Sequence, residues 1–402
     1  MVFSKVGALA SGKTPKGGER VPNGPDSPTV QAMGRRALTF LEFFAGGGMA
    51  RLGLGARWDC RFANDLDPLK ARTYRANFGA GDLVEGDVWE LAAANLPSAD
   101  LAWASSPCQD LSLAGPRDGL GGRRSSAYWG FHRLIAGLAA EGRAPKVLVI
   151  ENVVGLFTSH GGADFTALCR SLAELGYRFG ALELDAAAWL PQSRPRAFVV
   201  ATSLTPPASG AEPSSPRVRA AADRLPTDLK ARWIGWNLLP PSRRNAGLAD
   251  LLEPDAAVPW FDPARTDKLL GLMNPLHRRR LQAAAAHGRA VGALYRRVRM
   301  EPGGKAQRAE VRFDGLAGCL RTPAGGSSRQ VLLVADHGKV RARHLTGREG
   351  ARLMGLPEDY ALPPAATAAL KVLGDGVAVP VVRALAEQIL EPLLDGAERA
   401  AA

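Results

Sequence analysis

The residue best suited to nucleophilic chemistry is Cys108, in the stretch SSPCQDLS that begins at Ser105. It follows the apolar run LAWA and precedes a segment rich in Gly, Ser and Arg. A thiolate is a strong nucleophile, but an ordinary cysteine with a pKa of about 8.5 is only a few per cent ionised at neutral pH. A nucleophilic role therefore needs a site that favours the thiolate, and an inert buried thiol is the alternative.

Two further motifs suit acid–base and anion-binding chemistry. Glu151 ends the apolar run VLVI, where desolvation raises the pKa of a carboxyl group and lets it donate a proton near pH 7. Arg194 and Arg196, two apart in QSRPR, point to one side of an extended segment and can clamp a base or a phosphate. A helix cap or surface acid, and a solvated arginine pair, are the simpler interpretations.

A glycine run and two acids indicate a bound ligand. FFAGGGMARLGLG, from Phe43, places glycines between a strand and a helix, where backbone amides can approach polar or anionic groups. Asp65, in NDLD, and Asp87, in GDV, follow the next two expected strands. Acids at consecutive strand ends suit a ligand that carries a ribose and an adenine. A glycine turn alone is weak support, because many turns have only a structural role.

The elements that must position these groups alternate from Ala37 to about Leu204. The runs LTFLEFF, RFAND, DLVEGDV, DLAWAS, KVLVIEN and RAFVVAT predict strands. Between them, apolar residues at helical spacing predict amphipathic helices around residues 71–78, 131–138 and 165–175. This alternation predicts an α/β fold with a doubly wound, mostly parallel, Rossmann-like sheet. In such a sheet the motifs above share the edge formed by the carboxyl strand ends.

Composition changes along the chain predict its organisation. We expect a disordered basic tail over 1–36, a main domain over 37–204, a second, smaller domain over 205–340, a returning C-terminal segment over 341–395 and a tail over 396–402. Residues 206–340 hold 22 Lys or Arg against 12 Asp or Glu, most of the chain's net charge of +12. A partner that touches this region is expected to be anionic.

Other features limit the class of protein. No apolar run reaches about 18 residues and no secretory signal is visible, so we expect no membrane partner. The four cysteines show neither a disulfide framework nor metal-ligand spacing. We therefore expect a cytoplasmic protein without a bound metal.

Taken together and in order, the motifs FFAGGG, NDLD, GDV, PCQ, ENV, QSRPR, RHLTGREGARLMGLPEDY and GDGVAVPV resemble those of the DNA cytosine-5 methyltransferases. The resemblance covers 38–204 and 341–394, or 221 of the 402 residues. PCQ and ENV on successive strands, followed by QxRxR, are the most specific part. The resemblance implies methyl transfer from S-adenosylmethionine to C5 of cytosine, with S-adenosylhomocysteine as the product.

The family's chemistry assigns roles to individual residues. The thiolate of Cys108 would add to C6 of the base, and Glu151 would hydrogen-bond the N3 and N4 edge. Arg196, with Arg194 nearby, would hold the ring. Because these groups cannot reach a stacked base, the target cytosine would be flipped out of double-stranded DNA.

The resemblance also implies binding residues. The expected cofactor-binding residues are Phe44, Ala45, Gly46, Gly48, Asp65, Leu66, Asp87, Val88, Pro107 and Asp375. The region 205–340 would be the target-recognition domain. The expected DNA-binding residues are Gln109, Ser112, Arg123, Arg124, Arg278, Arg279, Arg297 and Arg321.

Two positions depart from the family pattern. Gly48 is followed by Met49 where the family often has a second glycine, and Gly374-Asp375-Gly376-Val377 replaces the usual Gly-Asn-Ser-Val. Asp375 keeps an acceptor near the cofactor but adds a charge. We expect cofactor binding to survive both changes.

Several alternatives stay open from the sequence. One is cytosine methylation in transfer RNA, and another is a catalytically silent DNA-binding relative. A nicotinamide oxidoreductase on a similar sheet leaves PCQ, ENV and QSRPR unexplained. For the favoured function we expect a monomeric prokaryotic or phage enzyme associated with the nucleoid, with a cognate restriction endonuclease as a further candidate partner.

Overall fold

A computed structural model describes residues 36–107, 126–206, 214–244, 246–286, 288–322 and 329–401. From Ala37 onward the chain folds as one unit. Within the described ranges, no helix combines the length and the apolar character needed to cross a membrane.

In the described residues, seven strands form the main sheet in the order β3-β2-β1-β4-β5-β7-β6. Their bounds are β1 Leu38–Phe43, β2 Trp58–Asp65, β3 Leu83–Glu85, β4 Leu101–Ala104, β5 Val147–Val153, β6 Arg178–Asp185 and β7 Pro195–Thr202. β1 to β5 pair in parallel, whereas β7 is antiparallel to both β5 and β6. The predicted α/β, mostly parallel fold is confirmed, and each of the six predicted runs overlaps one of these strands.

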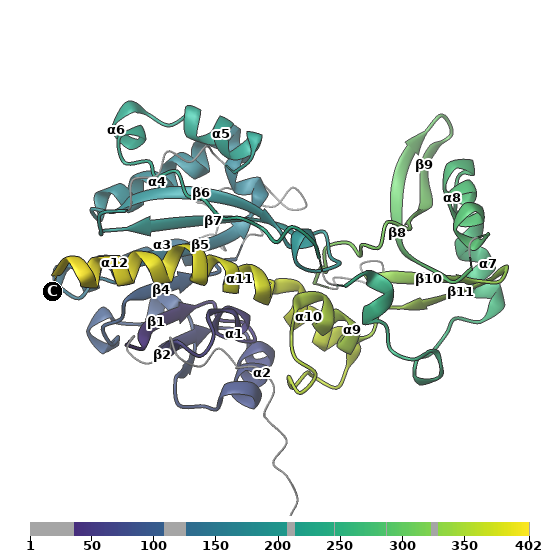
Figure 1. Ribbon diagram of the computed structural model, residues 1–402, viewed down its shortest axis with the longest axis horizontal. Coiled ribbons are helices and arrows are strands. Elements are labelled where there is room, and N and C mark those ends of the chain that lie inside the picture. The colour runs from purple at the N-terminus through teal and green to yellow at the C-terminus, as the bar shows by residue number, and fades with distance from the viewer. Residues whose placement is uncertain are drawn as a thin grey trace, which may run out of the picture. The chain divides into compact units, whose positions relative to one another are not determined.

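Helices cover both faces of this sheet. One face packs against α3 Ser126–Ala140 and α4 Ala163–Glu174. The other packs against α1 Met49–Leu54, α2 Pro68–Phe78 and the C-terminal helices. Those are α9 Gly347–Met354, α10 Ala366–Asp375, α11 Val379–Leu385, the π-helical turn η9 Ala386–Leu390 and α12 Glu391–Ala401. In Figure 1 the run from α11 to α12, in yellow, crosses the sheet. The C-terminal segment therefore returns to the N-terminal half of the fold.

A close approach joins the first helix to this returning segment. A Cβ atom at Gly53, in α1, would lie 2.8 Å from the carbonyl oxygen of Val379 and from Val382 Cγ1, so only glycine allows α1 and α11 to pack at this distance. Short 3₁₀ turns connect the larger elements elsewhere. They are η1 Val88–Glu90, η2 Ala93–Asn95, η4 Val154–Phe157, η5 Ser159–Gly162, η6 Ala186–Ala188, η7 Leu248–Leu251 and η8 Asp255–Ala257.

A second, antiparallel sheet of four described strands has the order β11-β10-β8-β9. Its strands are β8 Ala290–Glu301, β9 Gly304–Arg312, β10 Val331–Asp336 and β11 Lys339–His344, and α7 Pro263–Gly271 and α8 Pro275–Ala285 share its apolar core. The outer half of β8, RRVRME, is largely exposed, so it has no buried apolar face from which the sequence analysis could predict a strand.

The segment between the two sheets packs on the main sheet. Helices α5 Pro216–Asp223 and α6 Thr227–Lys230 contribute to the core that includes α3 and α4. The indole of Trp236 donates a hydrogen bond to the carbonyl of Val200 in β7, at 3.1 Å. Residues 216–238 therefore pack against the main sheet, although the composition change at 205 had assigned them to the second domain. At the C-terminus, α12 continues to Ala401 through most of the tail expected over 396–402. Leu393 and Leu394 are buried on the inner face of this helix.

Candidate active site

A cavity of about 620 Å³ opens at the carboxyl edge of the main sheet. Residues at the ends of β1, β2, β3, β4 and β5, or just after them, line it, together with the start of β7 and parts of the C-terminal segment. Eight of the ten expected cofactor-binding residues are among its lining: Phe44, Gly46, Asp65, Leu66, Asp87, Val88, Pro107 and Asp375. Parallel strands bring these residues together because their carboxyl ends meet at one edge.

The glycine turn after β1 fixes the orientation of Asp65. Gly46 has a φ of 59°, and its amide donates to Asp65 Oδ2 at 2.8 Å. The amide of Asp67 donates to Asp65 Oδ1, also at 2.8 Å. Burial raises the pKa of the Asp65 carboxyl, and Lys70 and the two amides oppose this effect. The result is a carboxylate held in place at the cavity wall by two backbone donors.

Ala45 and Gly48, the other two expected cofactor-binding residues, are not among the lining residues. The Gly48 amide donates to the carbonyl of Ala45 at 2.8 Å, which closes the turn. Gly48 has a φ of 78° and caps α1, and a Cβ atom there would collide with Phe78. These two residues therefore maintain the conformation of the turn without lining the cavity.

Ser105, Ser106 and Pro107 lead from β4 along the cavity wall toward Cys108. Trp103 Nε1 donates to Ser105 Oγ at 3.0 Å, and Asn152 Nδ2 lies 3.4 Å from both the carbonyl oxygen and Oγ of Ser106. Five residues singled out in the sequence lie outside the described ranges: Cys108, Gln109, Ser112, Arg123 and Arg124.

Glu151 and Arg196 meet in this cavity. Arg196 Nε lies 3.3 Å from Glu151 Oε1, and only 15% and 8% of the two side chains are exposed. Burial raises the pKa of Glu151, while the charges of Arg196 and Arg194 and a hydrogen bond from Ser105 oppose it. The net effect is a raised pKa, with burial as its largest cause.

Arg194 also lines the cavity but is 2% exposed. Its guanidinium donates to the carbonyl of Leu320 at 3.0 Å, to that of Gly374 at 2.8 Å and to that of Gly376. Burial, followed by the neighbouring Arg196, lowers its pKa. Arg194 thus connects the start of β7 by hydrogen bonds to Leu320 and to the segment Gly374–Gly376. The motif QSRPR alone did not indicate these contacts.

Residues 38–391 match a family model described as C-5 cytosine-specific DNA methylase. The chain belongs to this family. It is 28% identical to the Type II methyltransferase M1.ScrFI of Lactococcus lactis subsp. cremoris, over 88% of this chain and 78% of that protein. It is 26% identical to the Type II methyltransferase M.HhaI of Haemophilus parahaemolyticus, over 88% and 94% of the two chains.

Solved structures give the same fold. The Dnmt2 methyltransferase of S. pombe aligns with a TM-score of 0.58 and 18% identity, over 89% of this chain and 99% of that one. The resemblance stated from the sequence is confirmed, and so is the enzyme class, a DNA cytosine-5 methyltransferase.

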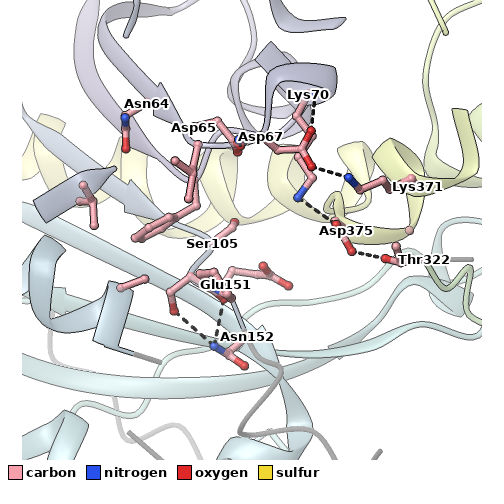
Figure 2. Close-up of a pocket in the computed structure, with 18 of the residues that line it drawn as sticks. Asn64, Asp65, Asp67, Lys70, Ser105, Glu151, Asn152, Thr322, Lys371 and Asp375 are labelled. Atoms are coloured by element: carbon pink, nitrogen blue, oxygen red, sulfur yellow. Dashed lines mark hydrogen bonds and ion pairs between the residues drawn. The ribbon is translucent and has the colours of Figure 1, made fainter. Parts of the chain in front are cut away.

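Three residues of this methylase that the sequence did not single out complete the cavity rim. Lys70 Nζ lies 2.8 Å from Asp375 Oδ2, and Thr322 Oγ1 donates to Asp375 Oδ1. Lys371 Nζ lies 2.5 Å from Asp67 Oδ2. Figure 2 shows Asp375 between Lys70 and Thr322, across the cavity from Glu151. No motif pointed to these pairs, because Thr322 is 53 positions from Asp375 and the two lysines are about 300 positions from their partners.

The described candidates for DNA contact are spread over the second half of the methylase. Arg278 and Arg279, in α8, border a second hollow that Arg308 also lines. Arg297, on β8, is 53% exposed and lies 3.3 Å from Glu310 on β9. The backbone of Arg321 packs on Gly374, next to the cavity. The structure therefore does not bring these arginines together at one place.

Proposed function

We propose that this methylase transfers a methyl group from S-adenosylmethionine to C5 of a flipped-out cytosine in a specific double-stranded DNA sequence, through a covalent bond between Cys108 and C6. One observation carries the proposal. The strand end that leads to Cys108, the Glu151–Arg196 pair and the anchored Asp65 carboxylate all line the same cavity.

The cavity fits S-adenosylmethionine. Its volume lies in the range typical of small-molecule sites. Asp65, with both oxygens oriented by backbone amides, suits the ribose hydroxyls, and Asp87 suits the adenine amino group. Leu66 and Trp89, which are 64% and 44% exposed, offer apolar surface to a flat base. When bound, S-adenosylmethionine supplies an electrophilic methyl group and leaves as S-adenosylhomocysteine.

The protein's part is to make C5 nucleophilic. The Cys108 thiolate forms a bond to C6, and the C5–C6 electron pair becomes available at C5 for bonding to the methyl group. Loss of the C5 proton to a base then lets the C5–C6 double bond re-form as the sulfur–C6 bond breaks, which regenerates the thiolate. Glu151 would hydrogen-bond the N3 and N4 edge and favour attack at C6, and its raised pKa suits proton donation at N3.

Arg196 would hold the base against Glu151. Its guanidinium is already oriented by that carboxylate, so little side-chain entropy remains to be lost on binding. Because none of these groups can reach a base inside a duplex, extrusion costs roughly a few kcal/mol in pairing and stacking. Contacts between the DNA backbone and the basic region of 205–340, the proposed target-recognition domain, would offset that cost.

The biological setting is part of the same proposal. The relatives named above are bacterial Type II methyltransferases. By that likeness we propose a monomeric enzyme that acts in the cytoplasm on nucleoid DNA, with a cognate restriction endonuclease as a candidate partner.

The test incubates purified protein with radiolabelled S-adenosylmethionine and either unmethylated genomic DNA or bulk transfer RNA, followed by bisulfite sequencing of the DNA. We expect label in DNA as 5-methylcytosine in a fixed context, loss of label with Cys108→Ser, and retention with Cys169→Ala, which removes a buried thiol in α4. Label in RNA alone would overturn the substrate assignment. No label in either, with DNA still bound, would favour a silent DNA-binding relative.

A covalent trap tests the adduct directly. In DNA that carries 5-fluorocytosine, fluorine replaces the proton that must leave C5. The bond between Cys108 and C6 therefore cannot break after methyl transfer, and the protein stays attached to the DNA. We expect wild type, but not Cys108→Ser, to form a complex with this DNA that survives denaturing electrophoresis. Turnover of normal DNA without such a complex would contradict covalent catalysis.

A further inference from the structure

We propose that Lys70 and Met49 are positioning residues for the cofactor pocket, each matched to a departure in the segment Gly374–Gly376. Lys70 balances the charge of Asp375, and Met49 fills the space that a side chain at 376 would need. The inference rests on the proposed function, because it assigns the segment a role in cofactor binding.

The charge match is seen in the contacts of Asp375. One carboxylate oxygen lies 2.8 Å from Lys70 Nζ, and the other accepts from Thr322 Oγ1 (Figure 2). Lys70 is largely shielded, with 18% of its side chain exposed. Burial alone would lower its pKa, but Asp375, Asp65 and Asp67 together raise it. The extra negative charge at 375 is therefore compensated within the cavity wall.

The position of Lys70 follows from the start of α2. Asp67 caps this helix by accepting hydrogen bonds from the amides of Leu69 and Lys70, and Pro68 occupies its first position. Lys70 therefore leaves the first helical turn on the side of Asp65 and reaches the cavity. One side chain thus connects the acid proposed for the ribose with the segment that closes the opposite wall.

The shape match involves the two atoms beyond Met49 Cγ. A Cβ atom placed on Gly376 would overlap Met49 Sδ and would lie 2.7 Å from Met49 Cε. Met49 is 1% exposed, so it has little room to move aside. It directly follows Gly48, the residue that caps α1 after the glycine turn. A side chain at 376 would therefore force the end of the buried Met49 side chain to shift.

Arg194 holds the same segment from a third side through the carbonyls of Gly374 and Gly376. Charge, shape and backbone contacts thus converge on three consecutive residues. Since Asp375 and Gly374 line the cavity, a shift of this segment changes the volume offered to the cofactor. We expect disruption of either match to weaken cofactor binding more than it slows the chemical step.

The charge match is tested by a double-mutant cycle with Lys70→Met and Asp375→Asn. Calorimetry with S-adenosylhomocysteine is expected to show that each single change raises Kd at least about tenfold, because the remaining charge at the cavity wall loses its nearest opposite charge. The double variant should return to within about threefold of wild type, since both charges are gone. Steady-state kinetics should show the same pattern in KM for S-adenosylmethionine, with kcat little changed.

Lys371→Met combined with Asp375→Asn is the matched control. Lys371 is a lysine on the same rim, but it pairs with Asp67. This combination should give no recovery of affinity. Additive effects of Lys70→Met and Asp375→Asn, recovery with Lys371→Met, or single variants that bind like wild type would each overturn the charge match.

The shape match is tested with Gly376→Ala and Met49→Ala. Gly376→Ala alone should raise Kd at least about tenfold through the clash, and Met49→Ala in the same chain should remove most of this effect. Urea unfolding without ligand tests both couplings independently of the cofactor. Wild type that fails to bind S-adenosylhomocysteine would overturn the proposed function, whereas wild type that binds but shows no coupling in either measurement would overturn only this inference.

Discussion

Arg196 Nε lies 3.3 Å from Glu151 Oε1, and the two side chains face the same cavity from the antiparallel strands β7 and β5. The pairing of these strands places Arg196 opposite Val153, two positions beyond Glu151. Burial and ion pairing act in opposite directions on the carboxyl group, so its charge is sensitive to what else enters the cavity.

The first prediction concerns Glu151 itself. Glu151→Gln keeps the size of the side chain but removes its proton chemistry, so methyl transfer to DNA should fall at least about 100-fold. Affinity for S-adenosylhomocysteine, measured by calorimetry, should stay within about threefold because the base edge and not the cofactor is affected. Glu141→Gln, a change at an exposed acid after α3, is the control and should keep full activity. Equal loss in both variants would contradict the assignment.

Asp65 should control cofactor affinity. Asp65→Asn removes the charge that two backbone amides orient at the cavity wall. Loss of charge-assisted hydrogen bonds should raise Kd for S-adenosylhomocysteine at least about tenfold. Asp59→Asn, on the exposed side of the same strand β2, should leave Kd unchanged. Unaltered affinity in Asp65→Asn would show that the ribose is bound elsewhere.

Arg194 should contribute mainly to stability. Arg194→Met leaves three carbonyl groups, those of Leu320, Gly374 and Gly376, without this donor. Because unsatisfied buried polar groups are costly, the free energy of unfolding in urea should fall by roughly 2–4 kcal/mol. Arg170→Met removes an exposed ion pair with Asp228 and should cost less than about 1 kcal/mol. Similar losses in the two variants would contradict a structural role for Arg194.

Glu42 should make stability depend on pH. It is 1% exposed in β1, burial raises its pKa to about 8, and its Oε2 has no partner among the described residues. When folding raises the pKa of an acid, the unfolded state loses the proton first as pH rises. The free energy of unfolding therefore falls until pH reaches the raised pKa. Between about pH 4.5 and 8, wild type should therefore lose up to about 4 kcal/mol relative to Glu42→Gln. Urea unfolding across this range checks it, and the surface change Glu85→Gln should give a curve parallel to wild type.

Arg279 should contribute to DNA affinity through phosphate contact. Arg279→Ala should weaken binding to every duplex alike and reduce the slope of log K against log salt by about 1. Arg280→Ala removes the same charge from the same helix, but Arg280 does not line the hollow formed with Arg278 and Arg308. A larger effect of Arg280→Ala on the slope would place the DNA on another face of α8.

Local sequence patterns were enough to predict the class of the main fold and the sheet edge at which the candidate site lies. Apolar runs and helical spacing are local patterns, so they were sufficient to predict β1 to β5, β7 and the helices between them. Parallel strands end at one edge whatever their order, which is why Asp65, Asp87 and Glu151 were expected in one cavity and line it together.

The side chains that neutralise and support that site, in contrast, could be found only from the folded chain. Lys70 and Asp375 are 305 positions apart, and no local pattern reveals a contact that depends on how the C-terminal segment folds back. For the same reason, the sequence did not show that Met49 and Gly376 share one space or that Arg194 holds distant carbonyls. The second sheet was also missed, because much of β8 and β9 is exposed and carries charged residues, whereas strands are most readily predicted from a buried apolar face.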